Sequence, residues 1–418
     1  KHGPGAIAER SRIIKYELKS YPRKLSTIFP PDYFASHDLT DRSEDDYEHP
    51  AVMHAVPKTQ KGPRLIAAEP SAHQWIQGGI RRWLEDRCQS TFLKHSIDFR
   101  NQEESRVLAL EASSTQDFAT VDLSAASDRL STRLVEYVFQ ANRSLLDALH
   151  ASRSRALIIP KGISSVYESD LLLKLRKFAP MGSAVTFPIQ TIVFTMIGHF
   201  ALCMADDDWD VSVDGLRRRA SRLRVFGDDI IIDKAAYGHL VRILHSCGLK
   251  VNEGKSFHQG YFREACGMDA YNGVDVTPAY FRKLYRPSSP ESLASIIECS
   301  NNFHKKGLWR TADWILKTVP ERELKTLAIG RKDVGSLSVF TFVAGPPSAV
   351  RRWNRDYHDW EYRVLTLTGK TTWLHGSGEA SLLQFFCEEP DPLIEWQSGQ
   401  AGRIQLRKRV GWVRANHP

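Results

Sequence analysis

The stretch from Arg222 to Asp233, Arg-Leu-Arg-Val-Phe-Gly-Asp-Asp-Ile-Ile-Ile-Asp, constrains this chain more than any other. Two short, apolar, β-prone runs flank Gly227, Asp228 and Asp229, a pattern that predicts a tight β-hairpin. Gly227 permits the backbone geometry of a two-residue turn. Such a hairpin would hold two adjacent carboxylates at its tip, where their repulsion favours a bound hard cation such as Mg²⁺. A solvated Asp-rich turn has the same composition, so this stretch alone leaves both interpretations open.

The composition indicates a folded protein with a sizeable core. The 418 residues are 42% hydrophobic and 10% aromatic, which excludes a disordered chain. The formal net charge of +8 favours a polyanionic partner, although many basic proteins share it. Six scattered cysteines show no metal-ligand spacing, so we expect reduced thiols in a cytosolic protein.

The apolar run over 185–205 has about the length of a membrane span. It carries a Pro, a Gln and a His, and we therefore expect a buried core helix and no membrane partner. The first residues contain no apolar signal-peptide region and no initiator Met. We expect the chain to begin inside a longer protein.

A Pro-punctuated stretch over 56–70 carries three cations at every third position, Lys58, Lys61 and Arg64. An extended loop with this spacing would suit the oxygens of a triphosphate, because it presents several positive charges along one edge. A basic loop that is simply solvated remains the alternative at this point.

A second acidic stretch runs from Ala119 to Leu130, Ala-Thr-Val-Asp-Leu-Ser-Ala-Ala-Ser-Asp-Arg-Leu. A short apolar strand is predicted to end at Asp122, followed by a serine-capped helix that runs to about Asn142. Asp128 would lie on the first turn of that helix, where an acid also simply offsets the helix macrodipole. Asp122, at a strand end, is the stronger functional candidate.

The loop over 181–186, Met-Gly-Ser-Ala-Val-Thr, leads into the apolar helix. Gly182 and Ser183 would let the backbone approach a ligand closely. Thr186 and Gln190 are four residues apart and would share one helical face. An ordinary junction between a loop and a helix would look similar.

The remaining sequence predicts an amphipathic helix over 235–247 and two short hairpins, the second turning at Asn272-Gly273. Beyond Pro287 the pattern becomes helical, with predicted helices over 291–306, 308–317 and 321–329. The basic strip over 403–414 interleaves aromatics with cations and would suit an RNA strand. A solvated basic tail is equally consistent with it.

Together these residues match the requirements of phosphoryl transfer. Two divalent ions can activate an attacking oxygen and neutralise a leaving one. Asp122 and Asp228 would bridge both ions with support from Asp229, and the basic loop would hold the triphosphate. Lys255 or Lys250 would act as the general acid for pyrophosphate.

The order of these motifs resembles motifs A to D of viral RNA-dependent RNA polymerases. The set comprises Asp122-x5-Asp128, Gly182-x3-Thr186-x3-Gln190, Phe226-Gly-Asp-Asp229 and Lys255. Residues 56–70 resemble motif F. The runs Val121-Asp-Leu-Ser-Ala-Ala-Ser-Asp128, Phe262-Arg-Glu-Ala-Cys-Gly267 and Gly273-Val-Asp-Val-Thr-Pro278 are similar to replicase β subunits of positive-strand RNA bacteriophages, the leviviruses.

The resemblance implies an α+β, right-hand fingers–palm–thumb polymerase with an antiparallel palm sheet backed by helices. The implied division is fingers over 1–118, palm over 119–142, a fingers insertion over 143–180, palm over 181–285, and a thumb with a basic C-terminal region over 286–418. The fingers would be incomplete at the N-terminus.

The resemblance also implies an RNA-directed RNA polymerase that uses ribonucleoside triphosphates and two Mg²⁺ ions, with Mn²⁺ as an alternative. The three acids Asp122, Asp228 and Asp229 would be the metal ligands. The ribose and its 2′-OH would be surrounded by Asp128, Thr186 and Gln190. The implied partners are RNA template and product, host elongation factors Tu and Ts and a ribosomal protein, in the cytoplasm of an infected bacterium.

Two alternatives remain. A reverse transcriptase shares the palm but usually carries other residues in place of Phe226-Gly227 and lacks an acid at the position of Asp128. A catalytically inactive, RNA-binding remnant of a polymerase is the second, and the three intact acids argue against it.

Overall fold

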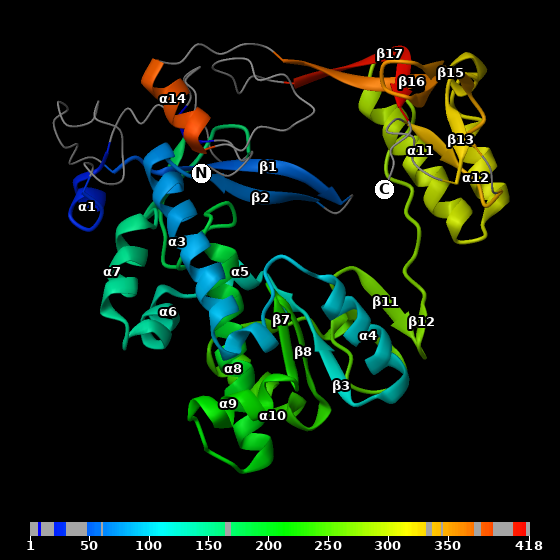
Figure 1. The fold of residues 1–418 in the computed structure, drawn as a ribbon. Coiled ribbons are helices and arrows are strands. Elements are labelled where there is room, and N and C mark those ends of the chain that lie inside the picture. Colours follow the sequence, from blue (N-terminus) through cyan, green and yellow to red (C-terminus); the bar gives the residue numbers. More distant parts are fainter. Residues whose placement is uncertain are drawn as a thin grey trace. The chain divides into compact units, whose positions relative to one another are not determined.

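The computed structural model describes residues 7–9, 21–30, 48–59, 62–163, 169–331, 337–343, 346–371, 378–387 and 404–414 (Figure 1). The chain divides into two compact units, the first comprising 1–277 with 375–400 and the second 278–374 with 401–418. Both mix helices and strands, which confirms the α+β class. The boundary lies at 277/278, whereas the expected palm–thumb boundary is at 285/286.

A three-stranded antiparallel sheet forms the centre of the first unit. Strand β8 (Asp229–Asp233) pairs on one side with β3 (Phe118–Val121) and on the other with β7 (Leu223–Phe226). Ile230 and Ile232 of β8 project from one face of the sheet and Ile231 projects from the other, and all three side chains are buried. Because both faces of the sheet are covered, its strands are mainly apolar.

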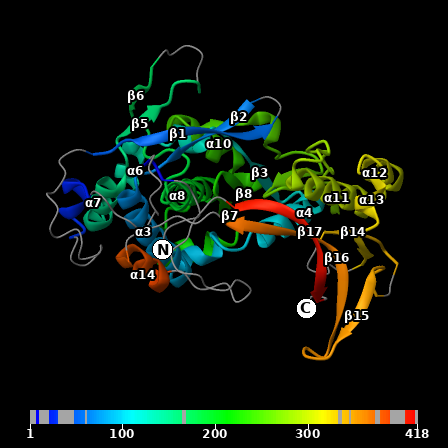
Figure 2. The same ribbon diagram turned by 90° about the horizontal axis from the view of Figure 1, so that it is seen from above.

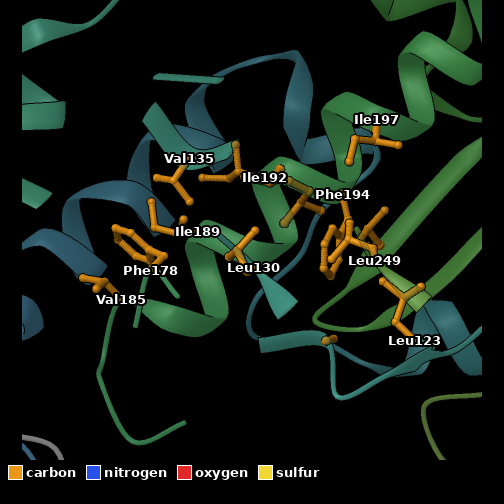
Figure 3. Packing of buried hydrophobic residues seen from close by; sticks show 14 of the residues in the cluster. Leu123, Leu130, Val135, Phe178, Val185, Ile189, Ile192, Phe194, Ile197 and Leu249 are labelled. Carbon is orange, nitrogen blue, oxygen red and sulfur yellow. The ribbon is translucent and has the colours of Figure 1, made fainter. Parts of the chain in front are cut away.

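Helix α8 (Thr186–Asp206) packs against β7 and is the main helix of the core. Figure 3 shows Ile189, Ile192, Phe194 and Ile197 of this helix among the packed apolar side chains. The helix is long and apolar enough to cross a membrane by length and composition, but 78% of its most apolar window is buried in the protein. This confirms the expected core helix.

A four-stranded sheet stands beside this core, with the strand order β2–β1–β5–β6 (Figure 2). Its strands are β1 (Ala51–Thr59), β2 (Gly62–Ala68), β5 (Ala156–Ile159) and β6 (Leu171–Lys174). Strands β1 and β5 pair in parallel and the other pairs are antiparallel.

Two hairpins follow the central sheet as predicted. They join β10 (Phe262–Ala265), β11 (Met268–Tyr271) and β12 (Val274–Asp275), with Asn272 and Gly273 in the second turn. Helix α4 (Glu103–Thr115) packs against β10 and β11. The predicted helix over 235–247 is α10 (Tyr237–Ser246).

The first unit contains further elements. Its other described helices are α1 (Arg23–Ser26), α3 (Ser71–Ser90), α5 (Ala126–Arg129), α6 (Thr132–Phe139), α7 (Arg143–Ser152), α9 (Val213–Ala220) and α14 (Gly378–Cys387). A two-stranded pair joins β4 (Leu123–Ser124) to β9 (Lys250–Val251), and short 3₁₀ turns cover Phe92–His95, Lys234–Ala236 and Glu253–Lys255.

The single helix predicted to run to Asn142 is wrong. The chain forms α5 and α6 with a break at Leu130, whose carbonyl accepts a 2.8 Å hydrogen bond from the Phe178 N–H. Ser131 then starts α6 by accepting the Leu134 N–H at 3.1 Å. The break depends on a residue distant in the sequence, and periodicity does not detect such a contact.

The second unit begins with helices, α11 (Pro290–Lys305), α12 (Trp309–Leu316) and α13 (Glu321–Leu324). The third predicted helix, over 321–329, is too long, because the chain leaves α13 to form β13 (Ala328–Gly330) in parallel with β14 (Ser338–Phe340). An antiparallel sheet follows, with β16 (Asp359–Thr371) between β15 (Val350–Asn354) and β17 (Ile404–Arg414). The basic strip therefore forms a long strand.

Candidate active site

A cavity of about 530 Å³ opens beside the Gly-Asp-Asp turn in the first unit. Its lining comes from β2, the segment after β3, the start of α8, the β7–β8 turn and the segment after β9. It brings together most of the sequence-predicted site residues, including Arg64, Asp122, Ser183, Gln190, Asp228 and Lys255. Sequence-distant residues thus meet in one place.

Asp122 is held at the end of β3 by contacts with the segment after β9. The pairing of Val121 with Ile230 places Asp122 beside the Gly-Asp-Asp turn. Its carboxylate Oδ2 accepts a 2.7 Å hydrogen bond from Asn252 Nδ2, and its N–H donates to Ser256 Oγ at 3.1 Å. Burial raises the pKa of Asp122, the Asn252 hydrogen bond opposes this, and the charge of Asp228 adds to it.

Asp228 and Asp229 differ in environment although they are adjacent. Asp228 is exposed and lines the cavity. Asp229 is more deeply placed, and its carboxylate accepts the Cys266 N–H at 3.2 Å. Burial, followed by the charge of Asp228, raises the pKa of Asp229 to about 6. The charge of Asp228 therefore opposes the ionisation of Asp229.

The turn that carries these acids is fixed by α8. Gly227 has a φ of +66°, and a Cβ at this position would lie 2.7 Å from the Phe187 ring. The Gly227 N–H donates to the buried Thr191 Oγ1 at 3.1 Å, and the rings of Phe187 and Phe226 pack edge to face, 5.0 Å apart. Only a glycine fits this combination of conformation and space.

The predicted hairpin and its two-residue turn are confirmed. Phe226 pairs with Asp229 across a two-residue turn. The positioning residues Asn252, Ser256 and Thr191, in contrast, were missed by the sequence reasoning. The only sequence signal for Asn252 is its place just before Lys255, which does not distinguish it from other polar loop residues.

The fit of the site to divalent cations depends on its carboxylates. Among the residues that the structure describes, no three His, Cys, Asp or Glu side chains are grouped closely enough to form a metal centre. Asp122 and Asp228 nevertheless line one cavity, with Asp229 beside them. Burial, and after it the charge of Asp228, raises the pKa of Asp122 and of Asp229. A donor set of carboxylate oxygens suits a hard cation such as Mg²⁺.

The loop before α8 also lines the cavity. Gly182 has a φ of +124°, and a Cβ there would lie only 2.0 Å from the Ala67 carbonyl oxygen, so this glycine is required by strand β2. The close approach that the sequence predicted for Gly182 is therefore an approach to the backbone of β2 and not to a ligand. The buried Gln77 supports the same loop, because its Oε1 accepts the Ala184 N–H at 3.1 Å.

Two of the predicted nucleotide-binding side chains have unused polar atoms. Ser183 Oγ and Gln190 Oε1 are buried and have no hydrogen-bond partner in the described part of the chain. Thr186 Oγ1, in contrast, donates to the Pro180 carbonyl at 2.8 Å. An unpaired buried polar group is costly, so Ser183 and Gln190 are the better candidates for a polar ligand.

The predicted basic loop is described only in part. Arg64 lies in β2, is exposed and lines the cavity. Lys58 lies in β1, and the position of its side chain is not described. Lys61 lies outside the described residues, so the predicted roles of these two lysines stay predictions.

Asp128 and Lys255 each pair with an oppositely charged side chain. Asp128 is not among the residues that line the cavity, and its carboxylate forms an ion pair with Lys177. Lys255 lines the cavity, but its ammonium lies 2.6 Å from Glu264 Oε1. This hydrogen bond raises the pKa of Lys255 and stabilises it as a cation. Lys250 is not among the lining residues.

A family model for the RNA replicase beta-chain matches residues 35–316, which is more than half of the chain. The chain belongs to the RNA replicase beta-chain family. This match extends over every residue of the cavity and over both acidic motifs. The resemblance drawn from the motifs is therefore confirmed.

Individual members of the RNA replicase beta-chain family are similar over part of their length. The RNA-directed RNA polymerase subunit beta of Enterobacteria phage SP is 34% identical over 276 residues, which cover 65% of this chain and 42% of the phage protein. The corresponding subunit of Escherichia virus Qbeta is 34% identical over 260 residues, which cover 62% of this chain and 38% of the Qbeta protein. The chain thus spans about two fifths of the length of these relatives.

Among solved structures, the RNA-dependent RNA polymerase of a human picorbirnavirus is similar with a TM-score of 0.45 and 14% sequence identity. This similarity covers 65% of this replicase beta-chain and 56% of the picorbirnavirus polymerase.

Proposed function

We propose that this chain carries the catalytic centre of an RNA-directed RNA polymerase, which replicates a viral RNA genome by joining NTPs to an RNA 3′-OH. One observation carries the proposal: Asp122 and Asp228, from separate motifs, line one cavity with Arg64, Ser183 and Gln190. The names of its phage relatives agree with this activity. Because the family match favours replicases, a reverse transcriptase is the weaker alternative.

The acidic wall would hold two Mg²⁺ ions, with Mn²⁺ as the substitute. Asp122, Asp228 and Asp229 are the proposed ligands, and a bound pair of ions would lower the barrier by stabilising both the attacking and the leaving oxygen. Asn252 orients the Asp122 carboxylate through its 2.7 Å hydrogen bond. The turn contacts of Thr191 keep Asp228 at the cavity edge.

The cavity residues from β2, from the loop before α8 and from the start of α8 would bind the incoming nucleotide. Arg64 provides a permanent positive charge for the triphosphate, with Lys58 and Lys61 as proposed helpers. The unpaired Ser183 Oγ and Gln190 Oε1 can exchange hydrogen bonds with the ribose, where a 2′-OH distinguishes RNA precursors from DNA precursors. The pairings of Thr186 and Asp128 make them weaker candidates for this contact.

The wider assignment is part of the same proposal. The central sheet with α8 would be the palm of a right-hand polymerase, the β1–β2 region part of the fingers and the second unit the thumb. RNA template, RNA product and NTPs would be its ligands in the cytoplasm of an infected bacterium. Host elongation factors Tu and Ts and a ribosomal protein are proposed partners, which co-purification of tagged chain from infected cells would test.

The decisive experiment measures nucleotide incorporation on an RNA template with NTPs, in parallel with dNTPs, and compares wild type with Asp228→Asn. We expect incorporation from NTPs alone and a loss of more than about 100-fold in the variant, because one ligand oxygen and its charge are removed. Asp233→Asn is the matched control, because Asp233 lies at the other end of β8 and pairs with Arg222.

RNA binding without incorporation by the wild-type chain, alone and with the three host factors added, would instead identify an inactive remnant. Incorporation from dNTPs would identify a reverse transcriptase.

A further inference from the structure

The C-terminal sheet of the second unit presents a face of arginine and aromatic side chains. Two neighbouring rows of paired residues cross its three strands, Arg352–Glu361–Arg414 and Val350–Arg363–Trp412. Directly paired residues in antiparallel strands project from the same face. We term this surface the Trp412 face, defined by Arg352, Tyr357, Arg363, Trp412 and Arg414.

Two arginines of the Trp412 face stack on its aromatic rings. The Arg352 guanidinium lies 4.3 Å from the centre of the Trp412 ring, and that of Arg414 lies 4.3 Å from the Tyr357 ring. Trp412 is 36% exposed and Tyr357 59% exposed. A stacked guanidinium is held flat while its N–H groups remain available at its edges. The face therefore offers ordered cations beside accessible rings.

This face carries more cations than acids. Arg352, Arg363 and Arg414 project from it together with the acid Glu361, whereas the other arginines of β15 and β17 alternate to the opposite face. Glu361 is buried and accepts hydrogen bonds from Arg352 at 2.8 Å and from Asn354 at 3.0 Å. In the described part of the chain no carboxylate forms an ion pair with Arg363 or Arg414. These two cations are available to an anionic ligand.

We propose that the Trp412 face binds single-stranded RNA, with bases stacked on Trp412 and Tyr357 and phosphates held by Arg363 and Arg414. Exposed rings combined with a row of cations are the two requirements of sequence-tolerant single-strand binding. The choice of RNA as the strand rests on the proposed function. The family match ends at residue 316, so this face is a feature of this chain beyond that match.

The test measures the binding of a fluorescein-labelled oligouridylate to the full chain by fluorescence anisotropy. The chain carries Asp228→Asn and no NTP is added, so binding is recorded independently of synthesis. We expect Trp412→Ala to weaken binding about tenfold with an unchanged salt dependence, because stacking is lost. We expect Arg363→Ala to reduce the slope of log K against log salt by about 0.7, because one phosphate contact is lost.

Matched controls lie on α12 of the same unit. Trp314 is 64% exposed and Arg310 is also exposed, but in the described structure neither takes part in an arginine–aromatic stack. We expect Trp314→Ala and Arg310→Ala to leave oligouridylate binding within twofold of the parent. Trp412→Phe retains a flat ring and should keep most of the affinity.

Unchanged binding in both Trp412→Ala and Arg363→Ala would overturn the proposal and leave a protein as the occupant of this face. An equal loss for double-stranded RNA would also overturn it, because a duplex cannot stack its bases on the rings. If thermal denaturation shows that Trp412→Ala is unfolded, Arg363→Glu at an exposed position replaces it as the test. Reversal of this charge must weaken oligouridylate binding if the proposal holds. Failure of nucleotide incorporation in the wild type would reject the proposed function and would leave this binding result intact.

Discussion

The central sheet and the C-terminal sheet, two of the three-stranded antiparallel sheets in the described part of this protein, use their charged residues in opposite ways. The central sheet, β3–β8–β7, buries its strands and concentrates exposed charge at one turn, where Asp228 stands next to the deeper Asp229. The C-terminal sheet, β15–β16–β17, keeps its cations along the strands and stacks them on surface rings. Burial makes the ionisation of Asp229 unfavourable and fixes the position of its carboxylate. The arginines of the C-terminal sheet are exposed, so their charge costs little free energy and a ligand can reach them.

The largest expected effect concerns a buried arginine of the first unit, Arg263, which the last prediction compares with the exposed Arg363. Arg263 is fully buried beside the central sheet, and its guanidinium donates to the carbonyls of Phe118, Gly260 and Phe262 at 2.7–2.9 Å. Arg263→Ala leaves these acceptors unpaired and should lower the free energy of unfolding by about 3–5 kcal/mol. Urea denaturation followed by circular dichroism measures this. A change below 1 kcal/mol would show that water replaces the guanidinium without cost.

The next effect concerns the burial of Asp229. The folded pKa of about 6 lies above the ordinary value of 3.8, so ionisation of Asp229 opposes folding. Stability from this group is complete below pH 4 and is lost as the pH rises through 6. In EDTA, Asp229→Asn should therefore be more stable than wild type by up to about 3 kcal/mol at pH 8 and about equal to it at pH 4.

Divalent ions sharpen this prediction. Added Mg²⁺ should stabilise the wild type at pH 8 and reduce the advantage of Asp229→Asn, because a bound cation offsets the repulsion between the carboxylates. The measurement is the denaturation midpoint in EDTA against that in Mg²⁺. An advantage that is independent of pH would contradict the burial of a charged Asp229.

A smaller effect is expected from the residue that orients Asp122. Asn252→Ala removes the 2.7 Å hydrogen bond to the carboxylate and should reduce nucleotide incorporation about 10- to 100-fold. A positioning role predicts that the variant needs more Mg²⁺ for half-maximal rate, whereas a purely structural role would lower the midpoint of denaturation. Asn252→Asp keeps the side-chain size but adds a charge, and its expected activity is lower still.

The smallest effect is expected on the C-terminal sheet. Arg363 is exposed and has no ion pair among the described residues, so Arg363→Ala should change the free energy of unfolding by less than about 0.5 kcal/mol. The same urea titration used for Arg263 measures it. A loss comparable with that of Arg263→Ala would show that the two sheets do not differ in the way proposed.

Local sequence predicted the elements that depend on neighbouring residues. The hairpin at Gly227 follows from two apolar runs with a glycine between them, and the hairpin at Asn272-Gly273 from turn chemistry. The apolar run over 185–205 predicted α8 because helices of this composition are buried. The acidic motifs, read with the family resemblance, identified Asp122 and Asp228.

Other features required the folded chain. The sequence does not show that Leu130 binds the backbone at Phe178, and a single long helix was predicted in its place. Gly182 was assigned to ligand approach, but its neighbour is the carbonyl of Ala67. The third helix of the second unit was predicted too long because β13 finds a partner only in β14.

The sequence by itself determined the turn chemistry, the core helix, the acidic motifs and the family, because each is written in residues that lie close together along the chain. Only the tertiary structure decided that Asn252 and Thr191 position the acids, that Asp229 is the more strongly perturbed carboxylate, and that the basic strip forms an ordered strand. These features depend on hydrogen bonds, desolvation and strand pairing between residues that are distant in the sequence. Local sequence patterns do not show which distant residues become neighbours in the fold.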